Sequence, residues 1–184
     1  LSTVMEKKFH STPKVFNELI NKDKPSSQAA SGRAKLMKSM LAFSKQAYLG
    51  IDKFPPEKAM YMAILKELKL HVKCEDKYIF QAPPGGSYID VWFEISKFLD
   101  STEGEARSFS ELDKLLLSEP FGVKQGLLPI FYLHAYLVYQ DDVALFEDGK
   151  YQPTMTEEHV ERFIKKPDSF KFQLYKLEGL NGSL

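Results

Sequence analysis

The feature that most constrains the fold is the apolar stretch 127–139, which a hairpin signal follows within a few residues. The stretch contains no Lys, Arg, Asp or Glu. It is shorter than the ~20 residues of a membrane-spanning helix, and Pro129 suits the first turns of a helix. We therefore expect a helix over about 124–139 that is buried in the core or in a protein interface.

The residues around this helix predict the rest of a small α+β unit. Two short β-like runs flank Asp148-Gly149, a dipeptide typical of tight hairpins. Thr156, followed by two glutamates, is expected to begin a helix that ends before Pro167. Alternation from Phe170 predicts a last strand. The order helix, helix, hairpin, helix, strand over 109–177 is that of a winged-helix module, with the hairpin as its wing.

The first half predicts a separate helical unit. Capping residues and apolar spacing predict helices at 11–22, 26–44 and 56–71 and a strand at 78–80. Apolar spacing also predicts a helix at 87–100, which begins the second unit. Pro83-Pro84-Gly85-Gly86 cannot continue a helix or a strand, so we place a junction there. The expected fold is mostly helical α+β, with a basic helical subdomain at 1–84 and a winged-helix-like subdomain at 85–184.

The balance of charge changes sign near the same place. Residues 1–80 carry 15 Lys and Arg against 8 Asp and Glu, and residues 81–184 carry 10 against 17. Such a split favours two subdomains with different partners, or two that attract each other. Surface variation that involves no ligand explains it equally well.

The cysteine content predicts a reducing compartment. Cys74 is the single cysteine, so no disulfide can form within the chain and no second Cys can complete a zinc site. The N-terminal residues lack the apolar core of a signal peptide. We expect a cytoplasmic protein without a membrane segment. Because the sequence begins with Leu rather than Met, we also expect a piece of a longer protein.

No residue pattern indicates catalysis, a cofactor or a metal site. The four histidines stand at no metal-ligand spacing, and no glycine-rich phosphate loop occurs. His134 is interpreted as a hydrogen-bonded packing residue. The acidic pairs at 141–142 and 147–148 are interpreted as a helix end and a turn. We therefore expect neither an enzyme nor a small-molecule substrate.

The basic face of helix 26–44 suggests contact with DNA. Small polar residues near the start of a helix can approach a groove closely, while its cations neutralise phosphates. The candidate nucleic-acid-binding residues are Asn17, Asn21, Ser27, Gln28, Arg33, Lys35 and Lys38. The alternative is a solvated face on a helix that packs through its apolar positions.

A protein partner, or other domains of the same chain, is expected to contact the second half. The candidate interface residues lie on the apolar helix, which is too apolar for a DNA groove: Phe131, Tyr132, Tyr136 and Tyr139. The hairpin is acidic and would be repelled by phosphate.

Several segments resemble part of the very large bacterial P-loop ATPases, some of which are linked to phage defence. The matching segments are Asn17-Glu18-Leu19-Ile20-Asn21, Pro25-Ser26-Ser27, Ala30 to Leu41, Gly122-Val123-Lys124-Gln125-Gly126, Leu128-Pro129, Asp142-Val143-Ala144-Leu145-Phe146-Glu147-Asp148-Gly149 and Pro153. The resemblance covers most of residues 11–175 in this order. It is a pattern of helix and turn residues, and in that family such segments lie far downstream of the nucleotide site. It implies a non-catalytic accessory region, without ATP binding of its own.

These observations predict a non-enzymatic interaction module, a fragment of a larger bacterial ATPase that binds protein and, through its basic half, DNA. The alternative is a small hydrolase or nuclease whose site assembles from distant residues such as His71, Asp141 and Glu147. A third interpretation is an architectural spacer that binds no partner.

Overall fold

The computed structural model describes residues 9–175. Within them, helices of all types account for about half of the chain, and the strands form two antiparallel sheets. The α-helices are α2 (Ser27–Ala42), α3 (Pro56–Met60), α4 (Ile89–Ser101), α5 (Asp113–Leu117), α6 (Leu128–Tyr139) and α7 (Glu157–Lys165). The strands are β1 (His71–Cys74), β2 (Lys77–Phe80), β3 (Val143–Glu147), β4 (Lys150–Gln152) and β5 (Phe170–Leu174). The expected mixed α+β class is confirmed.

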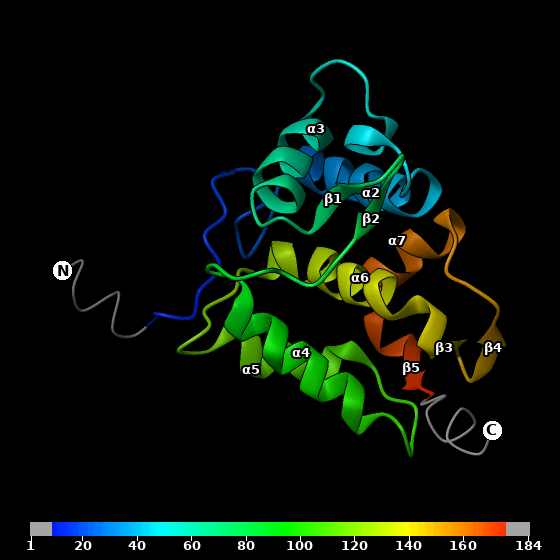
Figure 1. Cartoon of the computed structure of the whole chain (residues 1–184). Coiled ribbons are helices and arrows are strands. Elements are labelled where there is room, and N and C mark those ends of the chain that lie inside the picture. The colour runs from blue at the N-terminus through cyan, green and yellow to red at the C-terminus, as the bar shows by residue number, and fades with distance from the viewer. Residues whose placement is uncertain (1–8, 176–184) are drawn as a thin grey trace.

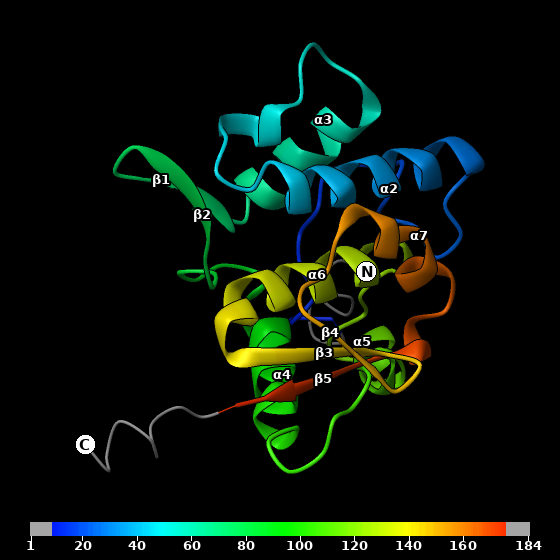
Figure 2. The same cartoon turned by 90° about the vertical axis from the view of Figure 1, so that its right-hand side faces the viewer.

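The apolar helix α6 lies at the centre of the molecule. Figures 1 and 2 show it between a layer that contains α2 and α3 and a layer that contains α4, α5 and β5. Its buried side chains point to every side of the helix: Leu128, Ile130, Phe131, Tyr132, Leu133, His134, Ala135, Tyr136 and Leu137. A helix that is apolar all round is stable in water only when its neighbours cover every face. The expectation of a buried helix is confirmed.

The predicted hairpin forms two strands of the larger sheet, whose order is β4-β3-β5. Glu147 pairs with Lys150 across a turn in which Asp148 and Gly149 have φ angles of 50° and 79°. Positive φ at both central residues is what a type I′ hairpin turn requires. β5 returns antiparallel to β3 along its whole length. The hairpin and the last strand are therefore confirmed.

The smaller sheet pairs β1 with β2, whereas the sequence predicts only a strand at 78–80 and extends the preceding helix to residue 71. In the structure that helix consists of α3 and a π-helical segment, Tyr61–Lys66. Lys69 then takes a φ of 58°. A residue in the left-handed region cannot continue a right-handed helix, so the chain turns there into β1.

The predicted helix at 11–22 is wrong, because residues 12–17 have no regular structure and only a turn follows. The Asn17 side-chain oxygen accepts hydrogen bonds from the backbone N–H groups of Leu19 (3.0 Å) and Ile20 (3.2 Å). Such local side-chain bonds compete with the backbone bonds of a helix. The segment is instead tied to α4, where Ser11 Oγ donates to the Asp90 carboxylate at 2.7 Å.

Helix α2 begins as predicted, with Ser26 Oγ accepting a hydrogen bond from the Ala29 N–H at 3.2 Å. The helix packs on α3 and on α7, and buried apolar residues from both halves of the chain form one cluster. The division into subdomains 1–84 and 85–184 stays a prediction.

A backbone clasp joins the segment before α2 to the segment before α6. The Gly126 N–H donates to the Lys22 carbonyl at 2.9 Å, and Arg33 Nη1 donates to the Gly126 carbonyl at 3.0 Å. The Gln125 N–H donates to the Asp23 carboxylate at 3.2 Å. The two segments lie about a hundred residues apart in sequence, so the clasp fixes the position of α2 relative to α6.

Replacing Gly126 by Ala should destabilise the fold by about 1–3 kcal/mol, because a Cβ has no room in the clasp. It would clash with the Ile20 carbonyl oxygen and lie 2.8 Å from the Lys22 carbonyl oxygen. Urea unfolding measures the loss. The control is Gly104→Ala, since nothing lies within 4 Å of a Cβ at that position. Equal unfolding midpoints for the two variants would contradict the clasp.

His134 is the polar residue at the centre of α6, and it is fully buried. Its Nε2 lies 2.8 Å from the Gln81 carbonyl oxygen, and its ring packs on Trp92 with 5.1 Å between centroids. Burial lowers the pKa of His134 to about 4, with the Gln81 hydrogen bond opposing the shift. The neutral ring is therefore a packing residue, as the sequence predicts.

The depressed pKa of His134 predicts a loss of stability on acidification. Below the unfolded-state pKa of about 6.5 the unfolded chain gains a proton that the folded chain does not take up until about pH 4. Above about pH 6.5 the neutral His134 ring makes its full contribution to the free energy of unfolding. That contribution falls by about 3 kcal/mol as the pH approaches 4. Urea midpoints at about pH 7 and about pH 5 measure it. In His134→Gln this part of the pH dependence should vanish, whatever the variant's stability near neutral pH. If the pH dependence is unchanged in the variant, His134 is not its source.

Candidate interaction surface

Most of the expected nucleic-acid-binding residues already have partners within the fold. Asn17 caps its own turn, and the Asn21 side-chain amide donates to the Val15 carbonyl at 3.1 Å. Lys38 pairs with Glu161 of α7 at 3.2 Å. Asn17 and Asn21 therefore stabilise their own turn, and the carboxylate of Glu161 offsets the charge of Lys38.

The remaining candidates do not form one basic face. Ser27, Gln28 and Lys35 are exposed on α2, and in the described part of the chain no hydrogen bond or ion pair engages Lys35. Arg33 is partly buried and holds the Gly126 carbonyl. DNA binding by α2 stays a prediction, with Lys35 as its one fully exposed cation.

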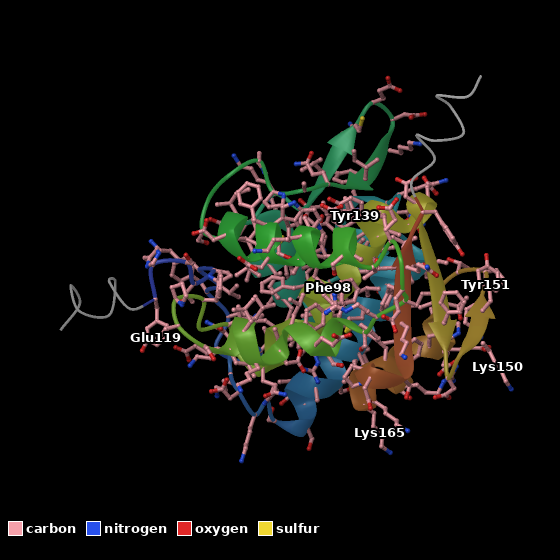
Figure 3. All side chains as sticks on the ribbon, turned by 90° about the horizontal axis from the view of Figure 1, so that it is seen from below. Phe98, Glu119, Tyr139, Lys150, Tyr151 and Lys165 are labelled. Carbon is pink, nitrogen blue, oxygen red and sulfur yellow. The ribbon has the colours of Figure 1, made fainter. Side chains whose placement is uncertain are left out.

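The expected protein interface on α6 needs a correction. Phe131, Tyr132 and Tyr136 are at most 2% exposed, so a partner cannot reach them in this structure. Tyr139 is partly buried, and its ring stacks on Trp92 of α4 with 5.8 Å between centroids; Figure 3 shows it beside that helix. All four side chains pack in or against the core, because α6 needs cover on every side. Burial in the core was the other interpretation that the sequence allowed for this apolar helix.

The structure does not bring His71, Asp141 and Glu147 together. His71 is buried between the Tyr61 hydroxyl, 2.8 Å from Nδ1, and the Ser44 carbonyl, 2.6 Å from Nε2. Glu147 accepts two hydrogen bonds from Arg162, at 2.7 and 3.1 Å, which hold the pKa of its carboxyl below the usual value. The two side chains belong to separate networks in different halves of the chain.

Asp141 lies on an exposed turn after α6. Among residues 9–175, no group of three or more His, Cys, Asp and Glu side chains could hold a metal ion.

An exposed apolar surface lies instead on the loop that precedes α3. Phe54 is 93% exposed, and Tyr48 and Met62 are also exposed. They line a hollow of about 340 Å³, here called the Phe54 patch, whose residues are Tyr48, Phe54, Pro55, Lys58, Ala59 and Met62. Figures 1 and 2 both show this loop projecting beyond the layers of the fold.

The backbone beside the patch is held in an unfavourable conformation. Three consecutive residues of η1 (Ala47–Gly50) have positive φ: Tyr48 (54°), Leu49 (53°) and Gly50 (67°). The left-handed region costs roughly 1–2 kcal/mol for a residue other than glycine. The fully buried Leu49 anchors the turn, and Tyr48 consequently lies on the surface. Residues held in sparsely populated backbone regions cluster at active sites, ligand clamps and switch regions.

Lysines surround the aromatic rings of the patch. Lys58 Nζ lies 4.4 Å and Lys66 Nζ 5.7 Å from the centre of the Tyr48 ring, both within cation–π range. Lys58 also donates to the Ile51 carbonyl at 2.8 Å. The exposed Lys53 directly precedes Phe54. Lys58 therefore lies in the lining of a mostly apolar hollow and Lys66 lies beside it, while the acidic Asp52 and Glu57 are next to Lys53 and Lys58 in sequence.

The sequence contained a weak signal for this patch. Phe54 stands in a segment that Gly50 and Pro55-Pro56 mark as a loop, and Tyr48 lies two residues before Gly50. The signal was missed because spacing alone does not tell whether a loop aromatic folds back on the core. Leu49 does fold back, and its neighbour Tyr48 does not.

Comparison of the chain with protein-family models, with curated proteins and with solved structures gives no match. No helix within residues 9–175 has the length and apolar character that crossing a membrane requires. The interpretation of the Phe54 patch therefore rests on its own geometry.

Replacing Lys53 by Gly should stabilise the loop. Lys53 has a φ of 60° and an exposed side chain, so glycine removes the left-handed penalty, although it adds entropy to the unfolded chain. A net gain of about 0.5–1 kcal/mol is expected in urea unfolding. Lys35→Gly, within α2, is the control and should lose about 1 kcal/mol. A loss in both variants would show that position 53 bears no such strain.

Proposed function

We propose that this chain is a non-enzymatic protein-interaction module, and that its Phe54 patch binds an acidic peptide segment with apolar side chains. The observation that carries the proposal is the near-complete exposure of Phe54 beside a hollow of about 340 Å³. A large aromatic next to a hollow is typical of the anchor residues that dominate binding energy at interfaces.

The charge around the patch favours an acidic partner. Lys53, Lys58 and Lys66 lie at its margin or next to it in sequence. Opposite charge on a partner speeds its approach and fixes its orientation, while apolar burial supplies most of the affinity. A partner segment that alternates acidic and apolar residues meets both requirements.

Nucleic acid fits the same surface less well. Single strands bind by stacking bases on open aromatic faces, and Lys58 and Lys66 already occupy positions over the Tyr48 ring. Tyr61 adds an edge contact, 5.8 Å between ring centroids. These contacts crowd the Tyr48 ring, so Phe54 is the open aromatic of the patch. DNA binding through α2 is kept as a second proposal, supported by the exposed Ser27, Gln28 and Lys35.

The rest of the chain is proposed to act as a rigid support. A winged-helix-like second half is part of this proposal, and the element order α5, α6, the β3–β4 hairpin, α7 and β5 supports it. In that module the second helix reads DNA, and here the helix in that position, α6, is buried. We infer a winged-helix-like unit used as scaffold, within a larger bacterial ATPase as the sequence resemblance implies.

Fluorescence titration of a labelled peptide with alternating Glu and Leu residues tests the proposed function. The peptide should bind, and a matched peptide with Lys in place of Glu should bind at least about tenfold more weakly. Phe54→Ser and Lys66→Glu should each weaken binding by about tenfold or more. The control is Phe93→Ser, because Phe93 is likewise exposed but lies on α4.

Equal binding by the wild type and Phe54→Ser would contradict the proposed site. Oligothymidylate and duplex DNA are titrated in parallel. Preferred binding of duplex DNA that is lost in Lys35→Glu and kept in Phe54→Ser would favour the second proposal instead.

A further inference from the structure

A second hollow, of about 410 Å³, lies where the two halves of the chain meet. Asp23, Lys24 and Arg33 of α2 line it from the first half, and Asp113, Leu128 and Phe163 line it from α5, α6 and α7. We call it the Arg33 pocket. Its volume is in the range of small-molecule sites, about 300–1,000 Å³. It is separate from the Phe54 patch, with which it shares no lining residue.

Arg33 has no charged partner in the described part of the chain. Its Nη1 donates to the Gly126 carbonyl, and its Nε is buried without any hydrogen bond. Burial lowers the pKa of the Arg33 guanidinium, since desolvation disfavours the charged form. Guanidinium groups withdrawn from water are normally paired with a carboxylate or phosphate, and this partly buried side chain has no such partner among the described residues.

Asp113 lacks the complementary cation. One carboxylate oxygen accepts a hydrogen bond from the Tyr132 hydroxyl at 2.6 Å. Burial raises the pKa of the Asp113 carboxyl, and the Tyr132 hydrogen bond opposes the shift. Among the described residues, no ion pair engages Asp113, and none joins it to Arg33.

Arg33 and Asp113 therefore share one pocket without an ion pair between them. Asp23, the other carboxylate of the lining, accepts a hydrogen bond from the Gln125 N–H and pairs with Lys124 at 3.9 Å. Removing a charge from water is costly unless an opposite charge replaces the lost hydration. Water can fill the hollow but supplies no counter-charge. A ligand that carries both charges would satisfy Arg33 and Asp113 at the same time.

The wall of the pocket adds a requirement for an apolar group. The lining includes the almost fully buried Phe163 and Leu128 and the partly exposed Ile164 and Pro129. Such a wall contributes affinity by removing apolar surface from water. A ligand with two charged ends and an aliphatic or aromatic side chain matches all three features.

We propose that the Arg33 pocket binds a small zwitterion with an apolar side chain, of the chemical class of the apolar α-amino acids. The ligand carboxylate pairs with Arg33, with Lys24 nearby, and the ligand ammonium group pairs with Asp113. The side chain packs on Phe163 and Leu128. Because the pocket is built from both halves of the chain, the bound ligand holds α2 against α6 and α7.

Isothermal titration calorimetry of the whole chain with leucine tests this site. Leucinamide lacks the carboxylate and isocaproate lacks the ammonium group. Each should bind at least about tenfold more weakly than leucine, because each leaves one buried charge without a partner. Dileucine, whose charges lie farther apart, distinguishes a free amino acid from a short peptide as the ligand.

Variants separate the two charges of the pocket. Asp113→Asn keeps an oxygen for the Tyr132 hydroxyl and removes the charge, so leucine binding should fall about tenfold or more. Arg33→Gln should have the same effect and Arg33→Lys a smaller one. Lys35→Gln, on the same helix but outside the pocket, and Phe54→Ser should bind leucine as the wild type does.

Circular dichroism shows whether each variant is folded. If Arg33→Gln is unfolded, the affinity of Asp113→Asn for leucine decides the test. Three results would overturn the proposal: no heat with leucine at millimolar concentration, equal affinities for leucine, leucinamide and isocaproate, or unchanged affinity in folded Asp113→Asn. Because Phe54→Ser leaves this pocket intact, failure here and failure of the proposed peptide binding are distinguishable.

Discussion

The burial of α6 on every side is the constraint on which the rest of the structure depends. Its apolar surface needs cover from above and below, and the layers of the fold supply it (Figures 1 and 2). Three of its polar side chains are paired across those layers, while His134 Nδ1 is buried without a hydrogen bond. His134 meets the Gln81 carbonyl, the Tyr132 hydroxyl meets Asp113, and the Tyr136 hydroxyl accepts from the Met155 N–H. Polar pairing of this kind fixes the rotation of the helix as well as its depth.

Local sequence signals correctly predicted the elements that depend on residues close in sequence, such as a helix cap and a hairpin turn. Ser26 caps α2, and Asp148-Gly149 forms the hairpin turn. The failures lie where distant contacts or side-chain bonds outweigh periodicity. Asn17 bonds its own backbone and prevents the helix expected at 11–22, and β1 forms only because Lys69 ends the preceding helix early. Neither outcome is visible in apolar spacing.

The candidate sites were less predictable than the fold, for a physical reason. The basic residues of α2 look alike in sequence, yet Arg33 meets a carbonyl 93 positions away and Lys38 a carboxylate 123 positions away. The aromatics of α6 look like an interface because apolarity does not tell a core from a contact surface. Lys150 and Tyr151, two consecutive residues of β4, are both exposed at the outer edge of the hairpin (Figure 3), so this strand shows no alternation.

The left-handed turn at 48–50 limits which sequences can carry the Phe54 patch. Glycine, asparagine and aspartate tolerate such backbone at little cost, whereas valine, isoleucine and threonine tolerate it poorly. Relatives of this chain that kept the turn would therefore avoid β-branched residues at 48, 49 and 53 and retain glycine at 50. A lineage that replaced the glycine by a residue other than asparagine or aspartate would add a third strained residue to the turn that places Tyr48 on the surface.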